Sequence, residues 1–164
     1  MSCAIETGRN HVWQRSDQGG RVVKTVKQML QEKHKDPSII SPDRSMLEAL
    51  RVMAETEVGA VMVVEDGSLV GVVSERDYVR RVAREGLTPD AQVKDVMTGD
   101  VVAVTPDYTA DQCMALMMQK HVRHLPVLAG SKLVGVISMR DVVRVTLDEK
   151  EYRIDQLESY ISGR

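Results

Sequence analysis

The chain has 164 residues, a formal net charge of -2 and 43% hydrophobic residues, enough for one compact domain or for two small halves that share a core. A net charge so close to zero supplies no general basic field, so nonspecific attraction to nucleic acid is not expected. Two cysteines without metal-ligand spacing, no secretory signal and no 18-residue apolar span argue against a disulfide framework and a membrane anchor. We therefore expect a cytoplasmic protein without a metal site.

The first half of the chain predicts an arm, a short helix and then a compact unit. Residues 1–24 lack a sustained helical or strand period and are interpreted as a flexible N-terminal arm. A short helix is expected over residues 22–31, stopped at Asp36-Pro37. The unit that follows has a strand at 38–41, a helix at 46–57 capped by Ser45, strands at 60–64 and 69–73 joined by an Asp-Gly turn, and a helix at 75–84.

The second half repeats the first. At an offset of 64, residues 37–80 overlay 101–144 with 14 identities in 44, and nine of these fall in the last 12 positions, which indicates an internal duplication. Residues 26–30 also resemble 93–97 at an offset of 67, so the first copy holds three extra residues near 32–36. The elements expected in the second copy are strands at 101–104, 124–128 and 133–137 and helices at 111–121 and 139–146.

This order of elements predicts an α/β (α+β) fold built from two βαββα repeats. A copy of about 60 residues on its own leaves one face of a three-stranded sheet uncovered, so the repeats should pack sheet to sheet about a pseudo-twofold axis. The domains expected are residues 25–86 and 93–147, followed by a C-terminal helix at 148–164.

Each repeat ends in the same short motif, which is Gly-Val-Val-Ser-Glu-Arg-Asp at 71–77 and Gly-Val-Ile-Ser-Met-Arg-Asp at 135–141. A carboxylate can accept both hydroxyls of a ribose, so Asp77 and Asp141 are the predicted sugar ligands. The alternative is that both are ordinary first-turn acids, which stabilise a helix through its dipole.

The other polar residues of the motif fit a phosphate. Ser74 and Ser138 are natural N-caps, and a helix start offers N–H groups to phosphate oxygens. Arg76 and Arg140 could bind a phosphate bidentately, or they could form solvated ion pairs that contribute little.

The pattern resembles a tandem pair of CBS (cystathionine beta-synthase) domains, called a Bateman module, over residues 22–147. The resemblance rests on the Ser41-Pro42 and Thr105-Pro106 steps, the strand entry from Val122 to Val127, and the two Gly-x-x-Ser-x-x-Asp endings. It implies a stand-alone signal-transduction protein that senses an adenosyl ligand (AMP, ADP, ATP, NAD or S-adenosylmethionine) and has no catalysis of its own.

The resemblance also implies roles for strand residues. Packing of the repeats about a pseudo-twofold axis places one ligand cleft beside each motif, so two clefts are expected here: the first beside Asp77 and the second beside Asp141. Arg123 and His124 match positions that contact phosphate in the family, whereas their counterparts Gly59 and Ala60 carry no charge. The two clefts should therefore differ in phosphate affinity. Adenine requires an apolar slot, which four strand residues could line. The alternative is that the same four residues are ordinary core, and the sequence does not favour either interpretation. These residues are Ile40, Val61, Val104 and Leu125, and Ser41, Thr105 and Pro126 complete the predicted nucleotide-binding set.

The sequence therefore predicts a non-catalytic sensor with AMP as its first candidate ligand and ATP, ADP or NAD as others. The alternatives are an S-adenosylmethionine sensor and a dimeric interaction module with degenerate pockets. A small hydrolase using Asp77 or Asp141 is disfavoured because a nucleophile and a metal cluster are lacking. The expected partners are a second copy and an unknown protein, with no nucleic acid and no membrane. The C-terminal helix is expected either to contribute to the dimer interface or to brace the module.

Overall fold

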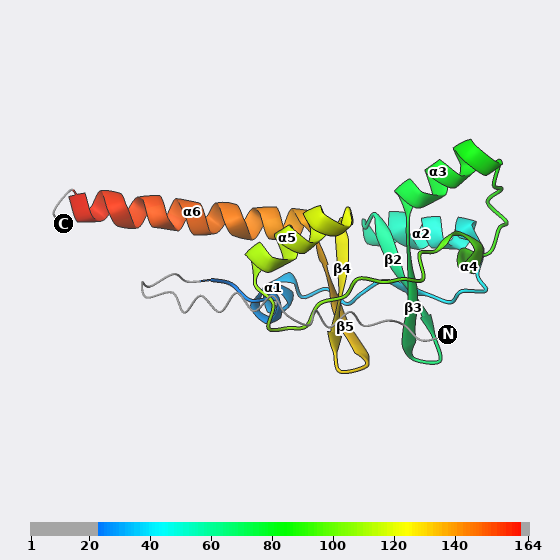
Figure 1. Ribbon diagram of the computed structural model, residues 1–164, viewed down its shortest axis with the longest axis horizontal. Coiled ribbons are helices and arrows are strands. Elements are labelled where there is room, and N and C mark those ends of the chain that lie inside the picture. The colour runs from blue at the N-terminus through cyan, green and yellow to red at the C-terminus, as the bar shows by residue number, and fades with distance from the viewer. Residues whose placement is uncertain (1–22, 162–164) are drawn as a thin grey trace.

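The computed structural model describes residues 23–161, so the predicted arm lies outside the described residues except for its last two positions. The elements in chain order are α1 (Val26–Lys33), β1 (Ile39–Ile40), α2 (Met46–Thr56), β2 (Ala60–Glu65), β3 (Ser68–Ser74), α3 (Glu75–Glu85), α4 (Val93–Val96), α5 (Ala110–Lys120), β4 (His124–Ala129), β5 (Lys132–Ser138) and α6 (Met139–Ile161). The mixed α/β fold is thereby confirmed; the first repeat has the full βαββα order, and the second has it except for its first strand (Figure 1).

The first repeat forms a three-stranded sheet in the order β1-β2-β3. β1 pairs parallel with β2, and β2 pairs antiparallel with β3 through a turn at Asp66-Gly67, both of which have positive φ. Such φ values suit Asp and Gly in a tight hairpin turn. Ser45 caps α2 as expected, and its capping box with Glu48 fixes where that helix begins.

The second repeat keeps the hairpin of β4 and β5 but loses the strand expected at 101–104, which is reduced to an isolated parallel bridge between Val104 and Val127. In the first repeat the N–H of Met62 donates to the carbonyl of Ser38 at 2.9 Å. Pro126 occupies the equivalent position and has no N–H to donate. The expectation of a full strand was wrong because one of its hydrogen bonds could not form.

The two sheets pack face to face, as predicted. Their shared core contains Met62 and Leu69 from the first repeat together with Val101 and Leu128 from the second. In Figure 1 the turns of both hairpins lie at one end of the molecule, while α3 and α6 start at the other. The polar ends of the two repeat motifs therefore lie at the same end of the sheets.

The short helices α1 and α4 each cross to the other repeat. Val26 and Met29 of α1 lie in the core of the second repeat, whereas Val93 and Val96 of α4 lie in the core of the first. The same backbone hydrogen bonds hold both helices: Lys27 N–H donates to the carbonyl of Pro106, and Lys94 N–H to that of Pro42, each at 2.9 Å. The weak resemblance of 26–30 to 93–97 thus marks a real structural equivalence, although α4 was not expected as a helix.

The last helix is longer than expected. The sequence predicts one helix at 139–146 and another beyond it, but α6 runs from Met139 to Ile161 as 23 residues without a break. Neither glycine nor proline occurs between these residues, so nothing in the sequence stops the first helix. Its far half extends away from the rest of the molecule (Figure 1). Among the described residues, no helix combines the length and the apolar character that crossing a membrane requires.

Candidate functional site

The candidate site lies where β3 and β5 end and the next helices begin. Each strand ends in a serine, and the first turn of the helix that follows holds an aspartate. Ser74 Oγ lies 2.5 Å from Asp77 Oδ2, and Ser138 Oγ lies 2.7 Å from Asp141 Oδ2. In return the N–H of each aspartate donates to its serine oxygen, at 3.2 and 3.3 Å. Each serine therefore caps its helix and orients its carboxylate at once.

The starts of β2 and β4 complete the surroundings of these two carboxylates. The carbonyl of Gly59 accepts from the N–H of Glu75 at 3.2 Å, and the carbonyl of Arg123 accepts from that of Met139 at 2.8 Å. Together with the serine caps, these bonds use two of the four N–H groups that have no partner within the helix at the start of α3 and of α6, which leaves fewer donors for a phosphate. The two strand starts also meet, since a Cβ added to Gly59 would lie 3.8 Å from Cε1 of His124.

His124 lies between the two repeat motifs and is kept neutral. Burial lowers the pKa of this imidazole first, and the positive charges of Lys33 and Arg123 lower it further. The carboxylates of Asp141 and Asp77 act in the opposite direction without compensating. One side chain thus experiences the charges of both repeats, which places the two motifs in one electrostatic environment.

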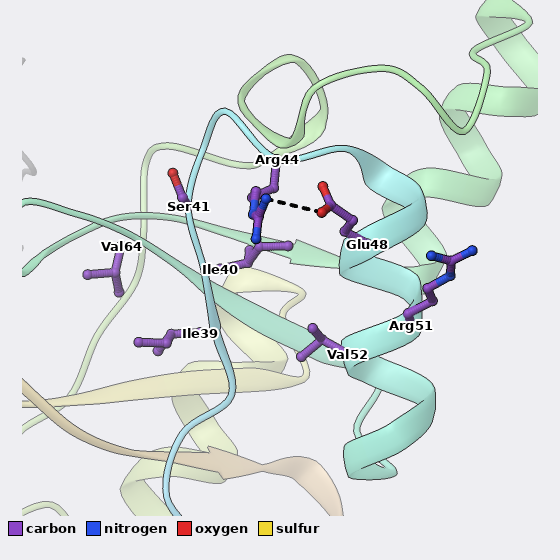
Figure 2. Close-up of a pocket in the computed structure, with 8 residues that line it drawn as sticks. All are labelled: Ile39, Ile40, Ser41, Arg44, Glu48, Arg51, Val52 and Val64. Carbon is purple, nitrogen blue, oxygen red and sulfur yellow. Dashed lines mark ion pairs between the residues drawn. The ribbon is translucent and has the colours of Figure 1, made fainter.

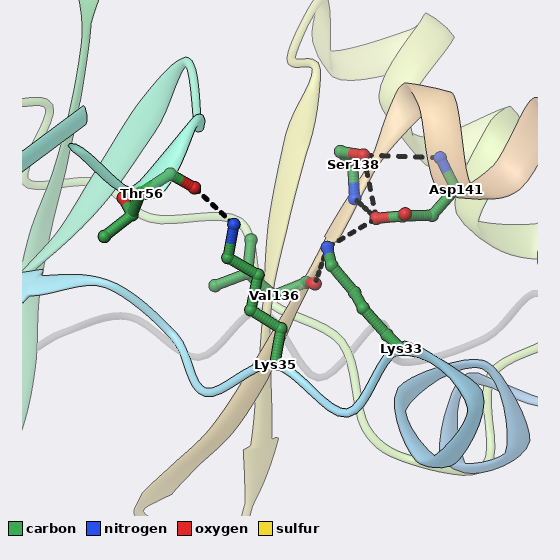
Figure 3. A network of polar contacts seen from close by, with 6 residues as sticks. All are labelled: Lys33, Lys35, Thr56, Val136, Ser138 and Asp141. Carbon is green, nitrogen blue, oxygen red and sulfur yellow. Dashed lines mark hydrogen bonds and ion pairs between the residues drawn. The ribbon is translucent and has the colours of Figure 1, made fainter. Parts of the chain in front are cut away.

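Asp141 has a partner that the sequence did not reveal. The ammonium of Lys33, at the end of α1, donates to Asp141 Oδ2 at 2.8 Å and to the carbonyl of Val136 at 3.2 Å (Figure 3). Burial would raise the pKa of Asp141, but the hydrogen bonds from Lys33 and Ser138 outweigh it and hold the pKa below its usual value. Lys33 was missed because it lies outside the aligned repeat, and the signal that could have found it is the three-residue insertion near 32–36.

The remaining predicted site residues lie along the strands, at the hairpin end of the sheets or in the first turns of the two helices. Ile40, Val61, Val104, Leu125 and Pro126 are buried along the strands. Ser41 and Thr105 are exposed and lie at the other end of the sheets, where the carbonyl of each accepts a turn hydrogen bond. Arg76 and Arg140 are exposed in the first turns of α3 and α6. The residues that do come together are Gly59, Ala60, Ser74, Asp77, Arg123, His124, Ser138 and Asp141.

This duplicated arrangement matches a known family. The family model for the CBS domain matches residues 26–84 and again residues 93–148. The chain belongs to the CBS-domain family. Its two CBS domains stand in tandem, and the capped aspartates close the last strand of each.

Related proteins share both the sequence and the fold of this CBS pair. The mitochondrial CBS domain-containing protein CBSX3 of Arabidopsis thaliana is 33% identical over 127 residues, covering 74% of this chain and 62% of that protein. A CBS-domain containing protein from Agrobacterium tumefaciens is 36% identical with a TM-score of 0.72, covering 75% of this chain and 99% of that one.

Two more distant structures share the fold and were solved with ligands. A CBS domain protein from Pyrobaculum aerophilum, complexed with AMP, has a TM-score of 0.68 at 23% identity, over 78% of this chain and 99% of that one. A CBS domain pair in complex with 5-methylthioadenosine and S-adenosyl-L-methionine has a TM-score of 0.69 at 21% identity, over 77% of this chain and 98% of that one.

A pocket of about 530 Å³ opens on the first CBS domain, between β1 and α2 (Figure 2). Ile39, Ile40 and Ser41 line one side of it, and an ion pair between Arg44 and Glu48, 3.3 Å long, crosses the other. Neither Ser74 nor Asp77 contributes to its lining. This pocket therefore belongs to the outer edge of the sheet and not to the carboxylate site.

Proposed function

We propose that this CBS pair is a non-catalytic sensor that binds an adenosyl ligand, with AMP as the first candidate and ATP, ADP or NAD as others. The observation that carries the proposal is the duplicated carboxylate, held by its own serine cap at the end of β3 and again at the end of β5. The AMP complex of the Pyrobaculum protein supports it by analogy of fold.

The chemistry of the two carboxylates suits a ribose. Asp77 is half-buried and has Ser74 as its hydrogen-bond partner, so its second oxygen can accept from a sugar diol. A hydrolase is a weaker proposal, because each Ser–Asp pair lies within one helical turn, as a cap, and does not face its partner across a substrate.

The two clefts are proposed to differ in their preference for phosphate. Arg123 and His124 flank the second carboxylate, whereas Gly59 and Ala60 hold the equivalent positions beside the first. A guanidinium can bind a phosphate bidentately, which an uncharged strand start cannot do. The second cleft should therefore favour the more anionic ligands.

Calorimetry on ligand-stripped protein tests the proposal with AMP, ATP, NAD and S-adenosylmethionine. We expect AMP to bind, and we expect Asp77→Asn and Asp141→Asn each to weaken one class of site about tenfold or more, since a charged hydrogen bond to the ribose is lost. Asp90→Asn, which alters an exposed acid far from the site, is the matched control and should bind as the unaltered chain does. Absence of binding by all four ligands at millimolar concentration would refute the sensor function.

An S-adenosylmethionine sensor is the second candidate, supported by the CBS pair crystallised with that ligand. Its sulfonium carries a positive charge, and the second cleft already holds Lys33 and Arg123. The cation would be repelled there, so this candidate predicts binding confined to the first cleft.

We also propose that two copies associate through α6 and that the pair signals to a protein partner in the cytoplasm. A ligand could change that signal only by binding more tightly to one arrangement of the two CBS domains than to the other. If neither cleft binds a ligand, the proposal that remains is a dimeric interaction module that associates through the same α6 surface.

A further inference from the structure

Lys33 neutralises the carboxylate of the second cleft, and within residues 23–161 it has no counterpart in the first. Its ammonium forms an ion pair with Asp141 at 2.8 Å, with side chains only 24% and 11% exposed. At the offset that relates α1 to α4, the residue matching Lys33 is Asp100, which is exposed. The two clefts therefore differ in the charge that each aspartate experiences, although their serine caps are alike.

The position of Lys33 follows from how the chain is built. α1 packs on the second repeat, and Lys33 is its last residue, followed by His34 in the left-handed conformation that ends the helix. The linker to β1 is also three residues longer than its counterpart. Lys35, two residues on, turns the other way and donates to the carbonyl of Thr56 at the end of α2 (Figure 3).

A ribose that takes Asp141 must compete with this ion pair. Oδ2 of Asp141 already accepts from Lys33, from the N–H of Ser138 at 2.8 Å and from its hydroxyl. A sugar diol that engages both carboxylate oxygens displaces the ammonium from Oδ2, and a half-buried ammonium then needs another anionic acceptor. A phosphate on the same ligand supplies that acceptor, whereas adenosine supplies none.

We propose that Lys33 makes the second cleft selective for phosphorylated adenosyl ligands, by opposing neutral ligands at Asp141 and by pairing with the phosphate of charged ones. The proposal rests on the adenosyl-binding function proposed above and assigns a specificity residue to one of its two clefts. It predicts opposite effects of one substitution on two ligands: loss of the ammonium should weaken the binding of AMP and strengthen the binding of adenosine.

The test compares AMP and adenosine by calorimetry in an Asp77→Asn background, which removes the first carboxylate. We expect Lys33→Met to lower the preference for AMP over adenosine by about tenfold or more, because one charge-assisted hydrogen bond is lost for AMP and one competitor is removed for adenosine. Lys33→Arg should keep most of the preference. Lys35→Met is the matched control, since it removes the same charge from the same linker without touching Asp141.

The possible outcomes distinguish failure of the role proposed for Lys33 from failure of the proposed adenosyl-binding function. Binding of AMP with an unchanged preference in Lys33→Met overturns the role of Lys33 alone. An equal loss of preference in Lys35→Met also overturns it, because the effect would then belong to the general field of the linker. Failure of the unaltered chain to bind either ligand overturns the sensor function and, with it, this selectivity.

Discussion

His124 shows how a single residue couples the two repeats. It starts β4, lies beside Gly59 at the start of β2, and responds to the charges of both aspartates. Since burial and two cations lower its pKa below the ordinary value of 6.5, the folded chain holds this imidazole neutral. Protonating it would place a third positive charge beside Lys33 and Arg123.

The stability of the fold should therefore fall as the pH drops through 6.5. The unfolded chain takes up a proton at His124 more readily than the folded chain does, so the free energy of unfolding rises with pH between the lowered pKa and about 6.5. Denaturation followed at several pH values should give a shallower slope for His124→Gln. Asp141 does not interfere in this window, because its own pKa lies below 3.8.

His121→Asn provides the control for that experiment. His121 is exposed and ends α5 in a left-handed conformation that asparagine tolerates, so the substitution removes an imidazole away from the site without disturbing the helix end. If His124→Gln does not change the slope of the unfolding free energy against pH, then protonation of His124 does not destabilise the fold.

At the same scale, the sequence predicted the two capped Ser–Asp pairs better than it predicted which other residues lie beside them. Asp77 and Asp141 were found because their Ser-x-x-Asp spacing is a local property of a capped helix start, repeated twice. Lys33 was not found because its contact with Asp141 spans 108 residues and depends on where α1 packs. Ile40 and Val104 were grouped with the carboxylates, but strand register carries them toward the other end of the sheets.

Among the elements, β3 and β5 each need a glycine for the helix that crosses them. A Cβ on Gly71 would lie 2.5 Å from the sulfur of Met97, and one on Gly135 would lie 2.5 Å from a methyl of Leu30. Neither glycine has a positive φ, so the requirement is close approach and not backbone conformation. Leu30 lies within α1 and Met97 directly follows α4, so each glycine leaves room for the short helix that packs on its own sheet.

We expect Gly71→Ala and Gly135→Ala to lower the free energy of unfolding by about 1 to 3 kcal/mol each, the usual cost of overpacking. Chemical denaturation measures the change. Gly59→Ala is the control and should stay within about 0.5 kcal/mol, because its nearest contact would be an ordinary 3.8 Å.

A double substitution checks the cause. If Leu30 is the obstacle, Gly135→Ala combined with Leu30→Ala should cost less than the sum of the two single changes. Strict additivity would mean that the glycine is required for another reason.

The elements themselves were largely predictable, because helix caps, the Asp-Gly turn and strand composition act locally. Two of the departures, the lost strand and α4, had non-local causes. The strand at 101–104 failed because its partner strand presents Pro126, and α4 is too short to show a helical period but is held by backbone bonds to Pro42 and Arg44.

For the molecule as a whole, α6 carries an apolar face that residues 23–161 leave exposed. Leu147, Ile154 and Leu157 are 55%, 54% and 57% exposed. Together with Val143 and Ile161, they follow the alternating spacing of three, four or seven residues that is typical of a coiled-coil seam. An isolated helix of this length is marginal in water, so a partner helix would stabilise it.

We propose that a second copy packs on this seam in an antiparallel arrangement. Such a pairing would set Leu147 of one chain beside Leu157 of the other, and Arg144 beside Glu158. Opposite charges then lie at both ends of the seam, while Glu151 lies beside its own copy at the centre.

Light scattering should accordingly report a dimer that Leu157→Glu converts to a monomer. Tyr152→Glu is the matched control: Tyr152 is 59% exposed but lies off the seam, so the same charge there should leave the dimer intact. Truncation after Thr146 should also give a monomer. A dimer of unaltered mass in both Leu157→Glu and the truncated chain would place the interface elsewhere.

The crossing of α1 also bears on the order in which the chain is synthesised. Residues 38–97 contain every buried member of the first core, including α4, so this half can close as soon as it has left the ribosome. The second core needs Val26 and Met29, which were made before any other part of the fold, together with Val142 and Val145, which come nearly last. α1 therefore cannot pack until the second hairpin and α6 have been synthesised. A nascent chain stalled before Met139 should carry one finished half and an unpaired α1.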